Sequence, residues 1–119
     1  MMRAIRGAVC LKADNADEML EAVGEMLTTI LERNQITTDD LVSVLFTCTP
    51  DIHCGFPARA AREFGFGDVP LMCAQEIDVA GALQLTVRVM LHANIDTPRD
   101  EIRHVYLRGA EVLRPDVKS

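Results

Sequence analysis

The most constraining feature of this sequence is a strict alternation of side-chain type over residues 84–92, QLTVRVMLH. Aliphatic residues occupy positions 85, 87, 89 and 91, and Arg88 belongs to the intervening set. A period of two residues is that of a β-strand and not of a helix. The chain must therefore build a sheet, and Arg88 must lie on the sheet face opposite an aliphatic row.

Four further segments have strand character, namely residues 3–11, 41–49, 69–74 and 102–109. The second of them is rich in β-branched and apolar residues and is stopped by Pro50, which predicts a buried central strand. In the first, Arg6 falls on the face away from the apolar row. In the last, the alternation places His104, Tyr106 and Arg108 together on one face.

The sequence also predicts one long and one short helix. Asn15 and Glu18 have the spacing of a capping box, and apolar residues recur at helical spacing from there to Asn34. Pro57 begins the short helix, which ends before the GFGD segment. Together these elements predict an α+β fold, with a mixed five-stranded sheet and the long and short helices on one face.

Length and composition limit the classes of function. The 119 residues correspond to one domain, 1–119, in which 111–119 is expected to be a loosely ordered C-terminal tail. A net charge of -6 argues against nucleic acid as the partner, and no stretch is apolar enough for a membrane span. The four cysteines form no CxxC pair, so we expect reduced thiols, no metal site and a cytoplasmic protein.

Three side chains on the face away from the apolar row suit a small anion. Arg6, Arg88 and Tyr106 are predicted in three different strands, and two guanidinium groups with a phenol can bind a carboxylate. Three unrelated surface or interface residues are the alternative. Because Met90 and Cys10 make this face half apolar, we expect a neighbouring subunit to cover it in a small homo-oligomer.

Cys73 and Glu76, in the segment CAQE, lie at the predicted end of a strand, where side chains often line sites. A nucleophilic cysteine needs a base beside it, and none of the three histidines has a spacing that places it there. Cys73 is therefore interpreted as a buried thiol or a hydrogen-bond partner. Glu76 can be a general base, the partner of an arginine or a solvated acid, and the spacing alone does not choose among these.

Four segments in a fixed order resemble a known family: AIRGA, CTPDIHCGFPARAARE, VPLMCAQEIDVAGAL with VRVM, and IRHVYLRGAEVLRPD. Their succession is similar to the AroH class of monofunctional chorismate mutases, from Met1 to about Asp116. The other class of chorismate mutase is all helical, and the period-two segments do not fit it.

The resemblance implies a homotrimer whose sheets enclose a pseudo-α/β barrel, with an active site in the cleft between each pair of adjacent subunits. It implies an intramolecular Claisen rearrangement of chorismate to prephenate, on the route to phenylalanine and tyrosine, without metal or cofactor. Chorismate and prephenate are then the expected partners, with no nucleic acid and no membrane.

The resemblance also implies site residues by position. Arg6, with help from Tyr106, would bind a substrate carboxylate, and Arg88 would reach both a carboxylate and the ether oxygen of the breaking bond. Glu76 and Cys73 would meet the ring hydroxyl. The other implied substrate-binding positions are Phe56, Ala58, Arg59 and Arg62 at the pocket mouth, Met72, and Leu113 with Arg114 in a tail that closes over the pocket.

Two positions depart from the family pattern. Arg59 stands where the family has lysine, which keeps the charge, and Met72 stands where it has threonine, which leaves only a backbone contact. Two rival functions remain to be weighed: an enamine/imine deaminase of the RidA type, and a non-catalytic carboxylate-binding or regulatory module. The CAQE and VRVM segments together argue against both.

Overall fold

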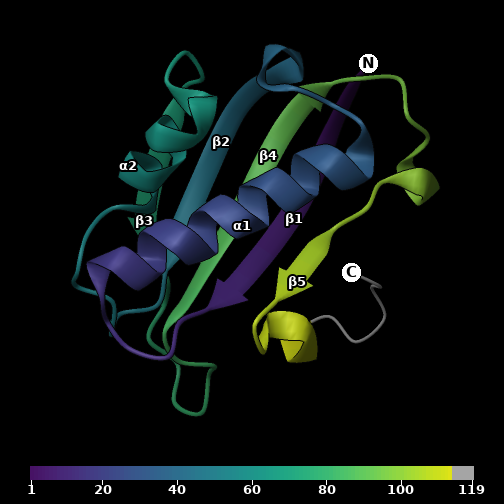
Figure 1. Ribbon diagram of the computed structural model, residues 1–119. Coiled ribbons are helices and arrows are strands. Elements are labelled where there is room, and N and C mark those ends of the chain that lie inside the picture. The colour runs from purple at the N-terminus through teal and green to yellow at the C-terminus, as the bar shows by residue number, and fades with distance from the viewer. Residues whose placement is uncertain (114–119) are drawn as a thin grey trace.

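The computed structural model describes residues 1–113, with α1 and α2 on the same side of a five-stranded sheet (Figure 1). The strands are β1 (Met2–Cys10), β2 (Leu41–Cys48), β3 (Leu71–Gln75), β4 (Thr86–Asn94) and β5 (Val105–Leu107), and the helices are α1 (Ala16–Asn34) and α2 (Pro57–Ala61). The strand order is β3-β2-β4-β1-β5, with β4 antiparallel to both neighbours and each edge strand parallel to its own. The predicted α+β fold with a mixed five-stranded sheet is confirmed.

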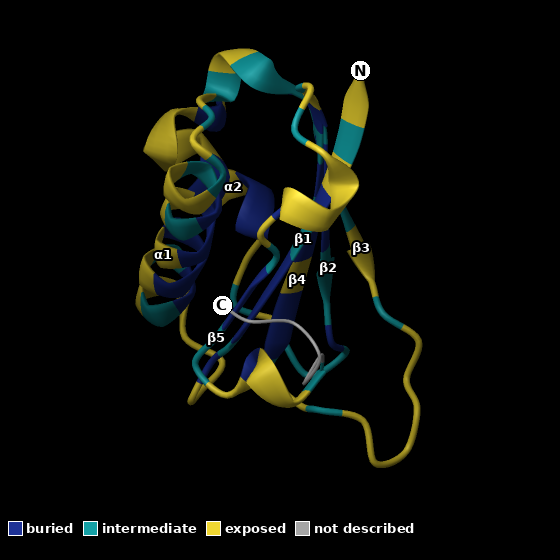
Figure 2. Ribbon diagram, turned by 90° about the vertical axis from the view of Figure 1, so that its right-hand side faces the viewer, coloured by how far each residue is buried: buried dark blue, intermediate teal, exposed yellow. Residues whose placement is uncertain are grey.

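The central strand is β4, and this corrects the expectation for residues 41–49. In β2, Val44 and Phe46 are buried, but Leu45 between them is 38% exposed. The helix layer covers only one face of the sheet, so β2 has one buried and one open side. Figure 2 shows buried residues concentrated where the helices meet the sheet, and exposed residues along β3 and the loop after it.

The core lies between α1 and the sheet, as the helical spacing of apolar residues in α1 requires. Gly7 in β1 marks a point of close approach between these two layers. A Cβ at this position would lie 2.8 Å from Ile30 Cδ1 of α1 and 3.2 Å from the carbonyl oxygen of Val105 in β5. Only a residue without a side chain fits there, so Gly7 allows α1 to cross directly over β1.

The predicted capping box of α1 is half formed. The Asn15 side chain accepts a hydrogen bond from the backbone N–H of Glu18 at 2.9 Å, as a capping residue should. The Glu18 carboxylate, however, accepts from the backbone N–H groups of Lys12 and Ala13 at 2.6 and 3.2 Å, and not from Asn15. Glu18 thus ties the loop before the helix to its first turn.

Arg108 does not share a face with Tyr106, contrary to the prediction. Strand β5 ends at Leu107, and Arg108 has a φ of +54°, which breaks the alternation. Its guanidinium group instead forms ion pairs with Glu21 and Glu25 on α1, at 2.9 and 3.1 Å. Arg108 therefore joins β5 to the outer, acidic side of α1.

The first three residues of the expected tail, 111–119, belong to a short 3₁₀ helix. This helix, Ala110–Leu113, follows β5 and buries Ala110 against the sheet face away from α1. Residues 114–119, and Arg114 with them, lie outside the described residues. Within residues 1–113, the structure contains no helix with the length and apolar character to span a membrane.

Candidate active site

Arg6 and Arg88 lie on the same face of the sheet, the face away from α1. In the antiparallel register of β1 and β4, Arg88 pairs with Ala8 and Arg6 pairs with Met90. The two arginines are thus diagonal neighbours on adjacent strands, whose backbones at such positions lie about 7–8 Å apart. Two arginine side chains that project from backbone positions at this spacing are long enough to reach one small dianion together.

Tyr106 lies in the same row of the sheet as Arg88, since both residues pair with Ala8, Tyr106 from β5 and Arg88 from β4. The alternation therefore placed Arg6, Arg88 and Tyr106 on one face correctly. Tyr106 is only 4% exposed, because it packs in a small cluster with Ala8 and Ala110. Leu113 is partly buried against this same cluster, so the chain beyond β5 returns to the arginine face.

Glu76, just beyond the end of β3, is the partner of an arginine and not a solvated acid. Its Oε2 lies 3.1 Å from Nε of Arg88 in an ion pair, and the Glu76 side chain is only 16% exposed. Thr47 on β2 donates a hydrogen bond from its hydroxyl to the same oxygen, at 2.6 Å. The Glu76 backbone N–H donates to the carbonyl oxygen of Cys48 at 2.9 Å, which fixes the start of the loop after β3.

A cavity of about 550 Å³ opens beside Arg6, toward the start of β1. No acidic residue is among the described residues that line it, whereas five carry a guanidinium or an imidazole group: Arg3, Arg6, His92, Arg99 and His104. The Nδ1 atom of His104 accepts a hydrogen bond from the backbone N–H of Arg6 at 2.9 Å, which ties this part of β1 to the segment before β5. In a chain with 18 acidic and 12 basic residues, this lining concentrates positive charge where an anion can use it.

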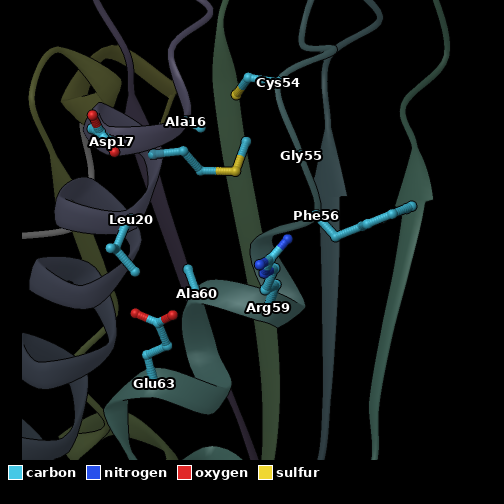
Figure 3. A pocket seen from close by; sticks show the side chains of 10 residues that line it. Ala16, Asp17, Leu20, Cys54, Gly55, Phe56, Arg59, Ala60 and Glu63 are labelled. Carbon is cyan, nitrogen blue, oxygen red and sulfur yellow. The ribbon is translucent and has the colours of Figure 1, made fainter.

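The residues expected at the pocket mouth lie elsewhere in the chain, in the helix layer. Phe56 and Arg59 border a cavity of about 270 Å³ between the start of α1 and α2 (Figure 3). Phe56 is 72% exposed, Ala58 is on the buried side of α2, and Arg62 is exposed just after α2. Within one chain the structure therefore does not bring these four residues together with Arg6 and Arg88.

The loop that carries Phe56 is anchored to the start of α1 by Asp14. The Asp14 carboxylate accepts hydrogen bonds from the backbone N–H of His53, at 2.9 and 3.0 Å, and from that of Cys54, at 2.9 Å. These bonds, that of His53 first among them, lower the pKa of Asp14 below its ordinary value. Phe56 is exposed, but its loop is thus held in a defined place.

Met72 and Cys73, neighbours on β3, point to opposite faces of the sheet. Met72 pairs with Leu45, which pairs in turn with Met90, so Met72 shares the arginine face and is 66% exposed. Cys73 pairs with the buried Phe46, and its side chain packs against the core. Of the two residues expected at a ring hydroxyl, the structure places the Glu76 carboxylate beside Arg88 and the Cys73 thiol on the other face.

Thr47, which lies beside Glu76 and Arg88, is a residue that the sequence did not single out. It pairs directly with Arg88 across β2 and β4 and binds Glu76, as described above. The signal was present in the alternation of β2, since Thr47 follows the buried Phe46 and must face the other way. What the sequence could not show was that Glu76 would fold back onto this strand.

Comparison with known proteins gives a consistent result over the full length. The family model described as chorismate mutase type I matches residues 2–117. The chain is 45% identical over 118 residues to the chorismate mutase AroH of Bacillus subtilis, covering 98% of this chain and 93% of that protein. It is also 45% identical over 120 residues to the chorismate mutase AroH of Thermus thermophilus, covering 100% and 98% of the two. A solved chorismate mutase from Clostridium thermocellum superposes with a TM-score of 0.90 and 44% identity, covering 92% of this chain and 98% of that one.

Two cysteines, Cys48 at the end of β2 and Cys54 in the loop bound by Asp14, provide a test of the thiol interpretation. Burial raises the pKa of Cys48 to about 12, and burial with a hydrogen bond to Asp14 raises that of Cys54 to about 11. Since only the thiolate is nucleophilic, we expect iodoacetamide at pH 8 to modify both residues far more slowly than free cysteine. The rates should rise as pH approaches the raised pKa values. Peptide mass spectrometry over time measures them, with the chain unfolded in denaturant as the fast control; reaction of either folded thiol at the free-cysteine rate contradicts the expectation.

Proposed function

The chain belongs to the chorismate mutase type I family, and from that premise we propose how its residues convert chorismate to prephenate. It is a chorismate mutase, an isomerase of aromatic amino acid biosynthesis. The reaction is a rearrangement within one molecule, so it needs neither a nucleophile nor a proton transfer. An enzyme can assist it by holding the reactive folded conformer and by stabilising the charge that develops on the ether oxygen.

The observation that carries the proposal is the placement of Arg6 and Arg88 as diagonal neighbours on one open sheet face. Chorismate carries two carboxylates, and a pair of guanidinium groups at fixed positions can hold both ends of the folded molecule. Arg6, beside the cationic cavity, binds one carboxylate with help from Tyr106, which lies on the same face in the row of Ala8 and Arg88. Arg88 binds the other carboxylate and directs a terminal nitrogen at the ether oxygen.

Glu76 orients Arg88 in this scheme. Its Oε2 contacts Nε of Arg88, and the terminal nitrogens of that guanidinium donate no hydrogen bond to another of residues 1–113. Oε1 of Glu76 likewise accepts no hydrogen bond within this part of the chain and can accept one from the ring hydroxyl. Cys73 contributes through its backbone, because its side chain faces the core.

We further propose that the active site is completed by a second copy of the chain in a homotrimer. Support comes from the pocket-mouth residues, which lie in the helix layer and cannot reach Arg88 of their own chain. The arginine face also exposes apolar side chains that a partner would cover, Leu45 at 38% and Met72 at 66%. A neighbour that seats its Phe56, Arg59 and Arg62 over this face closes the cleft and adds positive charge.

The place we propose for this activity is the cytoplasm. Support comes from the four cysteines, Cys10, Cys48, Cys54 and Cys73, which are all free thiols. The proposed reaction requires no metal ion. Within residues 1–113, no three or more His, Cys, Asp or Glu side chains are grouped so that they could hold one.

Substituting the two arginines should affect different steps. Arg88→Ala removes a donor at the developing oxyanion, so we expect kcat to fall by about 100- to 1,000-fold, or about 2.7–4 kcal/mol. Arg6→Ala removes a contact made to the bound substrate, so KM should rise more than kcat falls. The rate at which the ultraviolet absorbance of chorismate is lost, at several chorismate concentrations, gives kcat and KM for each variant. Arg33→Ala, on the exposed side of α1, is the matched control, and near-normal turnover by Arg88→Ala would show that these roles are wrongly assigned.

Mixing two inactive variants tests whether the site lies between subunits. Arg88→Ala and Arg62→Ala damage opposite halves of the proposed cleft, so each trimer alone has no intact site. After the two are unfolded and refolded together, about one quarter of the sites should combine two intact halves, and activity should return. Separately refolded proteins, mixed afterwards, are the control. If co-refolding restores nothing while light scattering shows three chains per particle, the shared site is excluded.

A further inference from the structure

Side chains from β2 and β4 meet at one carboxylate oxygen of Glu76, just beyond the end of β3, on the arginine face. Oε2 of Glu76 accepts the hydrogen bond from the Thr47 hydroxyl at 2.6 Å and forms the ion pair with Nε of Arg88 at 3.1 Å. Thr47 and Arg88 are direct partners in the register of β2 and β4. The Thr47 hydroxyl and the Arg88 guanidinium group therefore lie side by side and contact the same oxygen of Glu76.

The contact with Thr47 limits how Glu76 can pair with Arg88. A carboxylate free to rotate next to an arginine favours the two-pronged arrangement, in which both oxygens bind two guanidinium nitrogens. In the structure the ion pair joins Oε2 of Glu76 to Nε of Arg88 at 3.1 Å, and among residues 1–113 no hydrogen bond joins Glu76 to a terminal nitrogen of Arg88. Because Thr47 holds that same oxygen, the carboxylate cannot turn without losing a short hydrogen bond to a charged group.

A two-pronged pair would reduce catalysis in two ways. It would occupy a terminal nitrogen of Arg88, which is the part of the side chain available to the substrate. It would also use Oε1 of Glu76, the oxygen available to the ring hydroxyl. Small displacements of positioned groups cost large factors in rate, so the geometry of this pair matters beyond its presence.

We propose that Thr47 is a positioning residue of the active site, which holds Glu76 to a single contact with Arg88 and so leaves both terminal guanidinium nitrogens for the substrate. This inference rests on the roles proposed above for Glu76 and Arg88. Thr47 itself touches no reacting atom in this scheme. The surroundings favour a fixed arrangement, since the Glu76 side chain is 16% exposed and its backbone is bonded to Cys48 at the end of β2.

The test compares Thr47→Val, which keeps the shape and removes the hydroxyl, with Thr47→Ser, which keeps the hydroxyl. Thr47→Val should lower kcat about tenfold, equivalent to about 1.4 kcal/mol, with a change in KM of less than about threefold. Thr47→Ser should restore most of the lost rate. Thr29→Val is a matched control, because it makes the same change on α1, away from the arginine face, where the Thr29 hydroxyl donates to the carbonyl oxygen of Glu25 at 2.6 Å. The melting temperature of each variant separates a loss of rate from a loss of folding.

A second arm tests whether Thr47 acts through Glu76. In a Glu76→Ala background the hydroxyl has no carboxylate to hold, so adding Thr47→Val should change the single-turnover rate by less than about twofold. Thr47→Ala, with the same expected fall in kcat as Thr47→Val, replaces it if the valine variant does not fold.

The outcomes separate this inference from the proposed function. Normal kcat in Thr47→Val, together with a large loss in Arg88→Ala, overturns the role of Thr47 and leaves the site intact. Equal losses in the valine and serine variants, or an undiminished effect in the Glu76→Ala background, also overturn it. Normal turnover in Arg88→Ala overturns the site assignment itself.

Discussion

The antiparallel register between β1 and β4 is the constraint on which the site depends. It sets Arg6 diagonal to Arg88 on the open face, while the alternate residues of both strands pack beneath α1. A slip of one residue would send one arginine into the core and its apolar neighbour into water. Burial of the apolar row therefore fixes the register, and the register fixes the spacing of the backbone positions from which the two arginine side chains project. Gly7, between α1 and β5, keeps the layers close enough for that burial.

The sheet also separates opposite charges within an acidic chain. Glutamates of α1 face solvent or pair with Arg108 on the helix side, whereas the cavity beside Arg6 is lined by cationic and imidazole groups on the other side. A dianion that approaches the arginine face is thus shielded from much of the net charge of -6. Glu76 is an acid on that face, and its carboxylate forms an ion pair with Arg88 and accepts a hydrogen bond from the Thr47 hydroxyl. Such preorganised groups suit a reaction in which charge shifts within one bound molecule.

Much of the fold and one half of the site could be predicted from residue order alone. Period-two patterns placed Arg6, Arg88 and Tyr106 on one face because alternation is a local property of each strand. The pattern failed at Arg108, where a positive φ ends the alternation. It also misjudged Leu45, whose exposure depends on the number of layers that cover the sheet. Glu76 and Thr47 meet only through the tertiary fold, so no local pattern could pair them.

The other half of the proposed site had no local signal. Phe56 and Arg59 lie on α2 or just before it, and no spacing in one chain relates them to β4. Family resemblance supplied their expected role, and their distance from the arginine face within one chain is what supports the proposed second chain. The departures expected from the resemblance at Arg59 and Met72 would keep the charge at the first position and remove a hydroxyl at the second. The Met72 side chain nevertheless shares the arginine face, where it adds apolar surface for a partner.

The most direct test of the account is a double-mutant cycle between Arg6 and Arg88. Single-turnover kcat/KM for chorismate would be measured for the wild type, Arg6→Ala, Arg88→Ala and the double variant, at enzyme concentrations above that of the substrate. If both side chains hold the same molecule, the losses should be non-additive, with a coupling free energy of about 1 kcal/mol or more. Losses that add to within about 0.5 kcal/mol would mean that the two arginines act independently. That result would contradict a single substrate site formed by Arg6 on β1 and Arg88 on β4.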